Sequence, residues 1–62
     1  MEITNDDIRA YDSLSLEELI DERTRLAIEL TDESLDPDFR FYLFDCMEVV
    51  CDLIEIRMNV YA

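Results

Sequence analysis

The feature that most constrains the fold is the C-terminal segment 37–61, which is apolar around most of its circumference when plotted as a helix. At about 100° per residue, its polar side chains gather in one stripe that is only about 100° wide. The stripe consists of Asp38, Asp45, Glu48, Asp52, Glu55 and Asn59. A helix with so little polar surface is normally buried on several sides. We therefore expect this segment to form the centre of the folded protein.

Charge is distributed very unevenly along the chain. The 62 residues carry 17 Asp or Glu and 5 Arg, for a net charge of −12. Residues 1–38 hold 13 of these acids and 3 Arg, a net of −10, and residues 39–62 hold the other 4 acids and 2 Arg, a net of −2. So large a negative charge repels nucleic acid and anionic lipid surfaces. We therefore expect a basic protein as partner, with no direct binding to nucleic acid or to a membrane.

The composition favours one small all-α domain over residues 1–62. Half of the residues are hydrophobic, which is enough for a core, and the chain has no Gly. Tight β-hairpins usually need Gly at their turns, so its absence favours helices joined by short loops. The core of a domain this small rarely supplies more than about 3–5 kcal/mol, and such domains often add a partner subunit.

Local capping signals predict three helices. Thr4 is a predicted N-cap with an acid three residues later, and Ser15 with Glu18 has the pattern of a capping box. Asp36 is a third predicted N-cap, because Pro37 suits the first position of a helix. The predicted helices cover residues 5–11, 16–31 and 37–61.

The predicted architecture is a short N-terminal helix followed by an antiparallel helical hairpin, assembled as a dimeric helical bundle. The second helix is too short to cover the last one on several sides, and soluble monomers avoid large apolar patches. We therefore predict a homodimer with the last helices at its centre. The predicted dimer interface is Phe41, Phe44, Met47, Val50, Cys51, Ile54, Met58 and Tyr61. The same surface could instead receive another protein.

The second predicted helix and the loop after it carry a dense acidic surface. The predicted partner-binding residues are Glu17, Glu18, Asp21, Glu22, Glu29, Asp32 and Glu33. Their charges recur about every 3.5–4 Å along the helix axis, and one DNA strand carries a phosphate about every 3.4 Å. One hypothesis is that this surface imitates nucleic acid and occupies the basic site of a nucleic-acid-binding protein. The alternative is that these acids only keep the chain soluble.

Two arginines of the second helix have different expected roles. Arg25 is four residues from both Asp21 and Glu29, so we expect it to bond them along the helix surface. Arg23 lies in the middle of the apolar stripe. It either extends its charge to solvent over a buried stem or pairs with a carboxylate of another helix or subunit.

The chain offers little material for catalysis, a cofactor or a metal. It contains no His and no Lys, so the serines and thiols lack the usual base. Cys46 and Cys51 project about 140° apart on a helix, so they cannot form a disulfide with each other within it. We expect both to be small buried residues. The alternative is an intersubunit disulfide. The acidic loop 32–38 lacks the Gly of a calcium-binding loop. We expect no enzyme, no cofactor and at most a weak cation site.

In its size, acidity and lack of catalytic residues, the chain is similar to small proteins that phages and mobile elements use to block host nucleases or defence systems, and to small acidic antitoxins. The resemblance implies a non-catalytic inhibitor that acts by binding. The N-terminus lacks a secretory signal, so we expect a cytoplasmic protein. The alternative function is a structural or regulatory dimerisation module that docks a partner through its apolar C-terminal helix.

Overall fold

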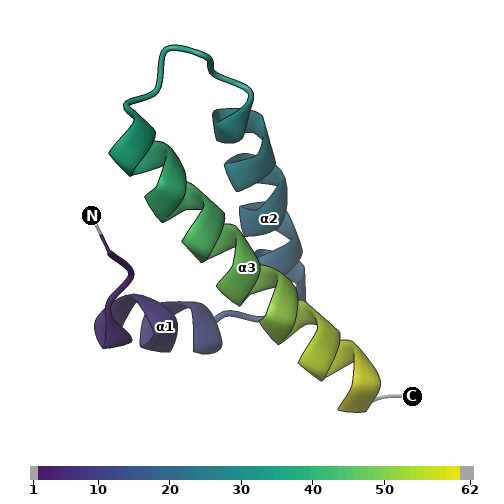
Figure 1. Cartoon of the computed structure of the whole chain (residues 1–62). Coiled ribbons are helices and arrows are strands. Elements are labelled where there is room, and N and C mark those ends of the chain that lie inside the picture. The colour runs from purple at the N-terminus through teal and green to yellow at the C-terminus, as the bar shows by residue number, and fades with distance from the viewer. Residues whose placement is uncertain (1, 61–62) are drawn as a thin grey trace.

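The computed structural model describes residues 2–60 and contains three helices there (Figure 1). Helix α1 spans Asn5–Asp12, α2 spans Leu16–Leu30 and α3 spans Pro37–Val60. All regular structure in the described part of the chain is helical, so the predicted all-α class is confirmed. The predicted helix bounds agree with the observed ones to within one residue, apart from Tyr61, which lies outside the described residues.

Reciprocal side-chain caps fix where the helices begin. The Thr4 hydroxyl accepts a hydrogen bond from the Asp7 N–H (3.2 Å), and the Asp7 carboxylate accepts one from the Thr4 N–H (3.0 Å). Ser15 and Glu18 make the same exchange at 3.1 Å in each direction. The Asp36 carboxylate accepts from a backbone N–H in the first turn of α3. These bonds satisfy N–H groups that have no partner within a helix, so the predicted N-caps are confirmed.

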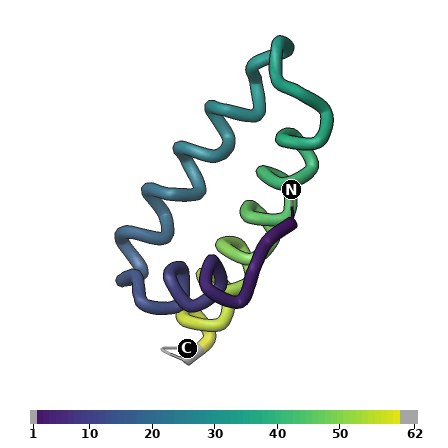
Figure 2. Tube along the Cα trace, turned by 90° about the vertical axis from the view of Figure 1, so that its left-hand side faces the viewer, coloured from purple at the N-terminus to yellow at the C-terminus, as the bar shows by residue number. Residues whose placement is uncertain are grey.

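The core lies between α2 and α3, which run antiparallel beside each other (Figures 1 and 2). Its buried side chains are Leu19 and Leu26 of α2 and Leu43, Cys46, Val50 and Ile54 of α3. Helix α1 packs against α3 near the end of the pair where α2 begins (Figure 2). Only part of the circumference of α3 is therefore covered by other elements.

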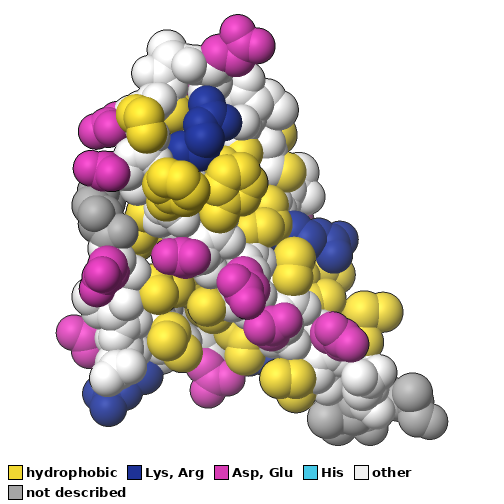
Figure 3. All heavy atoms as spheres, in the orientation of Figure 1, with side chains coloured by type: hydrophobic (Ala, Val, Ile, Leu, Met, Phe, Trp, Pro, Cys, Tyr) yellow, Lys and Arg dark blue, Asp and Glu magenta, His cyan; other side chains and the backbone are white. Residues whose placement is uncertain are grey.

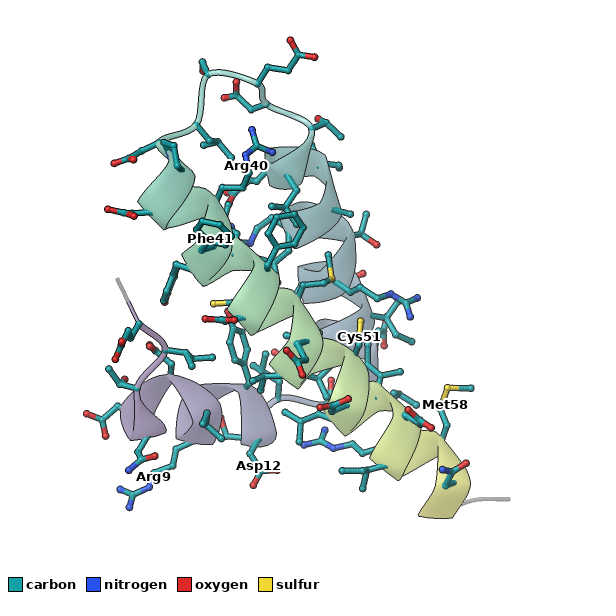
Figure 4. All side chains as sticks on the ribbon, viewed as in Figure 1. Arg9, Asp12, Arg40, Phe41, Cys51 and Met58 are labelled. Carbon is teal, nitrogen blue, oxygen red and sulfur yellow. The ribbon has the colours of Figure 1, made fainter. Side chains whose placement is uncertain are left out.

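Two arginines of α3 hold the ends of the α2–α3 pair together. The Arg40 guanidinium donates hydrogen bonds to the backbone carbonyls of Leu30 (3.0 Å) and Asp32 (2.6 Å), at the end of α2 (Figure 4). At the opposite end, Arg57 donates to the carbonyl of Asp12, the last residue of α1, and to the carbonyl of Leu14, in the link to α2. The last carbonyls of a helix have no partner within it and carry a partial negative charge. Each guanidinium therefore satisfies a helix end while fixing α3 beside it.

The molecule is flatter and more exposed than a compact domain of its length. Its Cα extents are 39 × 23 × 14 Å, and its radius of gyration is 12.1 Å. A compact domain of this length has a radius of gyration of about 10.6 Å. The accessible surface is 4585 Å², whereas a folded monomer of this mass exposes about 4200 Å². The excess surface includes several large apolar side chains of α3.

Candidate protein-binding surface

Three side chains of apolar character form a row on the outward side of α3. Phe44 is 50% exposed, Met58 is 57% exposed, and Cys51 between them is exposed as well. They follow one another at intervals of seven residues, close to two helical turns, so they lie along one line about 21 Å long. Figure 4 shows Cys51 and Met58 on the side of α3 that faces away from α1. We call these three residues the apolar row.

A band of carboxylates runs beside the apolar row. Asp45, Glu48, Asp52 and Glu55 are all exposed. In Figure 3, acidic side chains cross the face of α3 as a diagonal band with hydrophobic side chains on both sides. None of the four forms an ion pair with another of residues 2–60. Their negative charge is therefore uncompensated within the described part of the chain.

The apolar row and the carboxylates combine in a regular pattern. Phe41, Phe44, Glu48, Cys51, Glu55 and Met58 follow one another at alternating spacings of three and four residues. Helices that pair along a common seam use this spacing for the positions that contact the partner helix. We call this set the α3 seam. One of its two lines is the apolar row, and the other begins with Phe41 and continues with two glutamates.

The structure divides the predicted dimer interface between the core and the surface. The exposed members are Phe41, Phe44, Cys51 and Met58, and Met47 is half-buried. Val50 and Ile54 are buried against α2 and belong to the core of the single chain, which leaves neither of them available to a second subunit. Tyr61 lies outside the described residues. The surface open to a partner is therefore narrower than the sequence predicted.

The two cysteines lie in different environments, which corrects the expectation that both are buried. Cys46 is buried, and Cys51 is exposed because it projects from the opposite side of the same helix. The Cys46 thiol interacts with the Tyr42 hydroxyl and, together with burial, raises the pKa of Tyr42 to about 12. Burial is the main cause of a raised pKa at Tyr11, and the same thiol raises it further. Cys46 is thus part of the contact between α1 and α3.

Part of the predicted acidic face of α2 is neutralised by Arg25. Its guanidinium bonds both carboxylate oxygens of Glu22 (2.6 and 2.8 Å) and one oxygen of Glu29 (2.7 Å). The bond predicted between Arg25 and Glu29 is confirmed, but the other partner is Glu22 and not Asp21. A glutamate three residues away forms two parallel hydrogen bonds with the planar guanidinium, and such a two-bond pair is stronger than a single hydrogen bond. The hydrogen bonds from Arg25 lower the pKa of Glu22.

Two further acids of this face also serve the fold. Glu18 belongs to the cap of α2, and its hydrogen bonds with Ser15 lower its pKa. Asp32 accepts from the N–H and hydroxyl of Ser34 (2.9 and 2.7 Å), which lowers its pKa. The predicted face lines an open depression of about 290 Å³, whose walls are Leu14, Glu18, Asp21, Glu22 and Arg25. Four of the seven predicted partner-binding acids therefore have bonds within the chain, while Glu17, Asp21 and Glu33 are exposed.

Arg23 is exposed on α2 and makes no ion pair with another of the described residues. This agrees with a guanidinium that extends to solvent. The alternative, a pair with a carboxylate of another subunit, stays a prediction.

The described residues place limits on other kinds of site. Within residues 2–60, no three potential ligands among the acids and cysteines lie close enough together to hold a metal ion. No helix of the same region is both long enough and apolar enough to cross a bilayer.

Comparisons with known proteins add no further constraint. No protein-family model matches the chain, and comparisons with curated proteins and with solved structures gave no match. The α3 seam and the acids of α2 are therefore the two surfaces from which a function can be inferred.

Proposed function

We propose that this protein is a non-catalytic protein-binding module that presents the α3 seam to a basic partner. The observation that carries the proposal is the uncompensated acidic band beside the exposed apolar row. Burial of the apolar row provides affinity. The carboxylates beside it accelerate encounter with a basic surface and select against acidic ones.

The seam is favoured over α2 as the binding surface because its acids form no ion pair with another of residues 2–60. Using Glu22 or Glu29 for a partner would compete with their bonds to Arg25, and using Glu18 would open the cap of α2. The seam glutamates Glu48 and Glu55 can meet a partner without breaking a bond described within the chain. Large exposed aromatic side chains, which often anchor interfaces, are also found on α3 and not on α2.

A more specific version of the proposal is inhibition of a nucleic-acid-binding protein. The four carboxylates from Asp45 to Glu55 span about 15 Å, or one charge every 4–5 Å, and a DNA strand carries one every 3.4 Å or so. A basic groove that binds phosphates would also attract this band. For a basic protein that binds the chain, a 20-base-pair DNA duplex should compete for the same site in proportion to its concentration. Simultaneous binding of duplex and chain would exclude this version.

A second candidate is a homodimer formed through the apolar row. Phe44 and Met58 are equally distant from Cys51, so an antiparallel second copy would place Phe44 of one chain against Met58 of the other. The solution mass from light scattering tests this directly. A stable dimer has twice the 7.4 kDa of one chain, and a monomer at micromolar concentration leaves the seam free.

Selection from a random library of 16-residue peptides tests the proposal without knowledge of the partner. Immobilised wild-type protein should enrich peptides that combine Lys or Arg with apolar residues. The Phe44→Ser/Met58→Ser variant should lose this enrichment. Ile28→Ser is the control, because Ile28 is 65% exposed but lies on α2, outside the seam. Enrichment of uncharged or acidic peptides, or enrichment that survives in the double variant, would contradict the proposal.

A further inference from the structure

We infer that the ligand of the α3 seam is a cationic amphipathic helix, which lies along α3 with its apolar side on the apolar row. The inference rests on the proposed function and specifies the class of partner. It follows from the spacing of the seam residues, from their exposure and from the sign of their charge.

The spacing favours a helix over an extended or irregular segment. Contacts that recur every three and four residues along one helix are matched by a second helix, whose own side chains repeat with the same period. The apolar row is about 21 Å long, so a helix of about 14–18 residues would cover it. Glu48 and Glu55 stand seven residues apart in the second line of the seam. They would meet Lys or Arg side chains that are also about seven residues apart.

The charges of the seam disfavour a second copy of this chain as the occupant. In an antiparallel pair centred on Cys51, Glu48 of each copy faces Glu55 of the other. In a parallel pair in register, each glutamate faces the same glutamate of its partner. Both orientations place like charges together in the seam, and each chain carries a net charge of −12. Interfaces use such like-charge contacts to reject unwanted partners. A cationic helix would instead place Lys or Arg opposite Glu48 and Glu55, so that both contacts are attractive.

The affinity of two designed peptides tests the inference. One is an 18-residue peptide of Leu and Lys arranged as an amphipathic helix, and the other has the same composition in a scrambled order. Both carry the same charge, so only the arrangement of apolar side chains differs. By fluorescence anisotropy, the amphipathic peptide should bind at least tenfold more tightly. Circular dichroism of the mixture should show helix formation by the peptide, and affinity should fall as salt rises.

Matched variants locate the site on the molecule. Glu48→Lys/Glu55→Lys should weaken binding of the amphipathic peptide at least tenfold. Glu17→Lys/Glu33→Lys changes the net charge equally at exposed acids away from the seam, and should weaken binding less than threefold. Phe44→Ser/Met58→Ser should weaken binding at least tenfold, and Ile28→Ser should have little effect. Urea unfolding of each variant confirms that it is folded before its affinity is compared.

Each alternative result overturns a different step. Equal affinity for the two peptides would exclude a helical ligand while leaving a basic partner in place. Equal losses from the two glutamate pairs would mean that only net charge matters and would exclude the seam. Absence of binding to either peptide, with a dimeric solution mass, would exclude both the inference and the proposed function in favour of a second copy.

Discussion

Arg57→Met should remove about 1.5–3 kcal/mol from the free energy of unfolding. Met keeps most of the aliphatic stem and removes the guanidinium, which donates to the carbonyls of Asp12 and Leu14. Hydrogen bonds to charged groups contribute about 1.5–3 kcal/mol each. The side chain is 26% exposed, and we halve the summed contribution of the two bonds because water can partly replace them. Since the core of such a domain supplies only about 3–5 kcal/mol, the loss approaches half of the total.

Urea unfolding followed by circular dichroism at 222 nm measures this effect. With a slope of about 1 kcal/mol per molar urea for a small domain, the midpoint should fall by about 2 M. Asp12→Asn is the control, because its carboxylate is 4.0 Å from the guanidinium and 70% exposed. An exposed ion pair of this kind contributes less than about 1 kcal/mol. A shift below 0.5 M for Arg57→Met, or an equal shift for the control, would refute the role of the two carbonyl bonds.

Three further predictions concern the seam, a tyrosine and the thiols. Glu48→Leu/Glu55→Leu makes the seam apolar and should double the solution mass, and an unchanged monomer would contradict the role given to these acids. Folding raises the pKa of Tyr42 from 10.0 to about 12, so its contribution to stability should be complete below pH 10 and be lost as pH rises towards 12. The urea midpoint of Tyr42→Phe should fall less over this pH range than that of the wild type. Identical dependence of the two midpoints on pH would contradict the raised pKa of Tyr42. A thiol reagent should modify Cys51 rapidly and Cys46 only after unfolding; two fast reactions would contradict the burial of Cys46.

The helix starts were predictable because their causes are local. A capping box needs only a Ser or Thr and an acid three residues later, and both groups are visible in the sequence at Thr4 and Ser15. The all-α class was predictable for a similar reason. Tight hairpin turns usually need Gly, and the chain contains none. Short-range chemistry of this kind does not depend on how the helices pack.

The roles of Arg40 and Arg57 and the exposed side of α3 depend on packing and were not predictable. Arg40 and Arg57 bond carbonyls that are 8 to 45 residues away in the sequence. Periodicity showed that α3 is apolar on several sides, but the side that α2 covers is set by Leu19 and Leu26, which bury Val50 and Ile54. The spacing of Cys46 and Cys51 already indicated that they point in different directions. The predicted burial of Cys51 depended on the predicted dimer interface, and within the single chain Cys51 is exposed.

The position of the acids on α3 is more specific than solubility requires. Any exposed position on the outer side of the helix would serve to keep the chain in solution. Asp45 and Asp52 fit that role, because they lie beyond the seam. Glu48 and Glu55 instead lie in the second line of the seam, beside the apolar row, where they interrupt the contacts that two copies of this chain would make. We expect a surface that is apolar in one line and acidic in the next to disfavour self-association and to favour a helix of opposite charge. We therefore propose the exposed row as a site for a basic partner and not as an incomplete core.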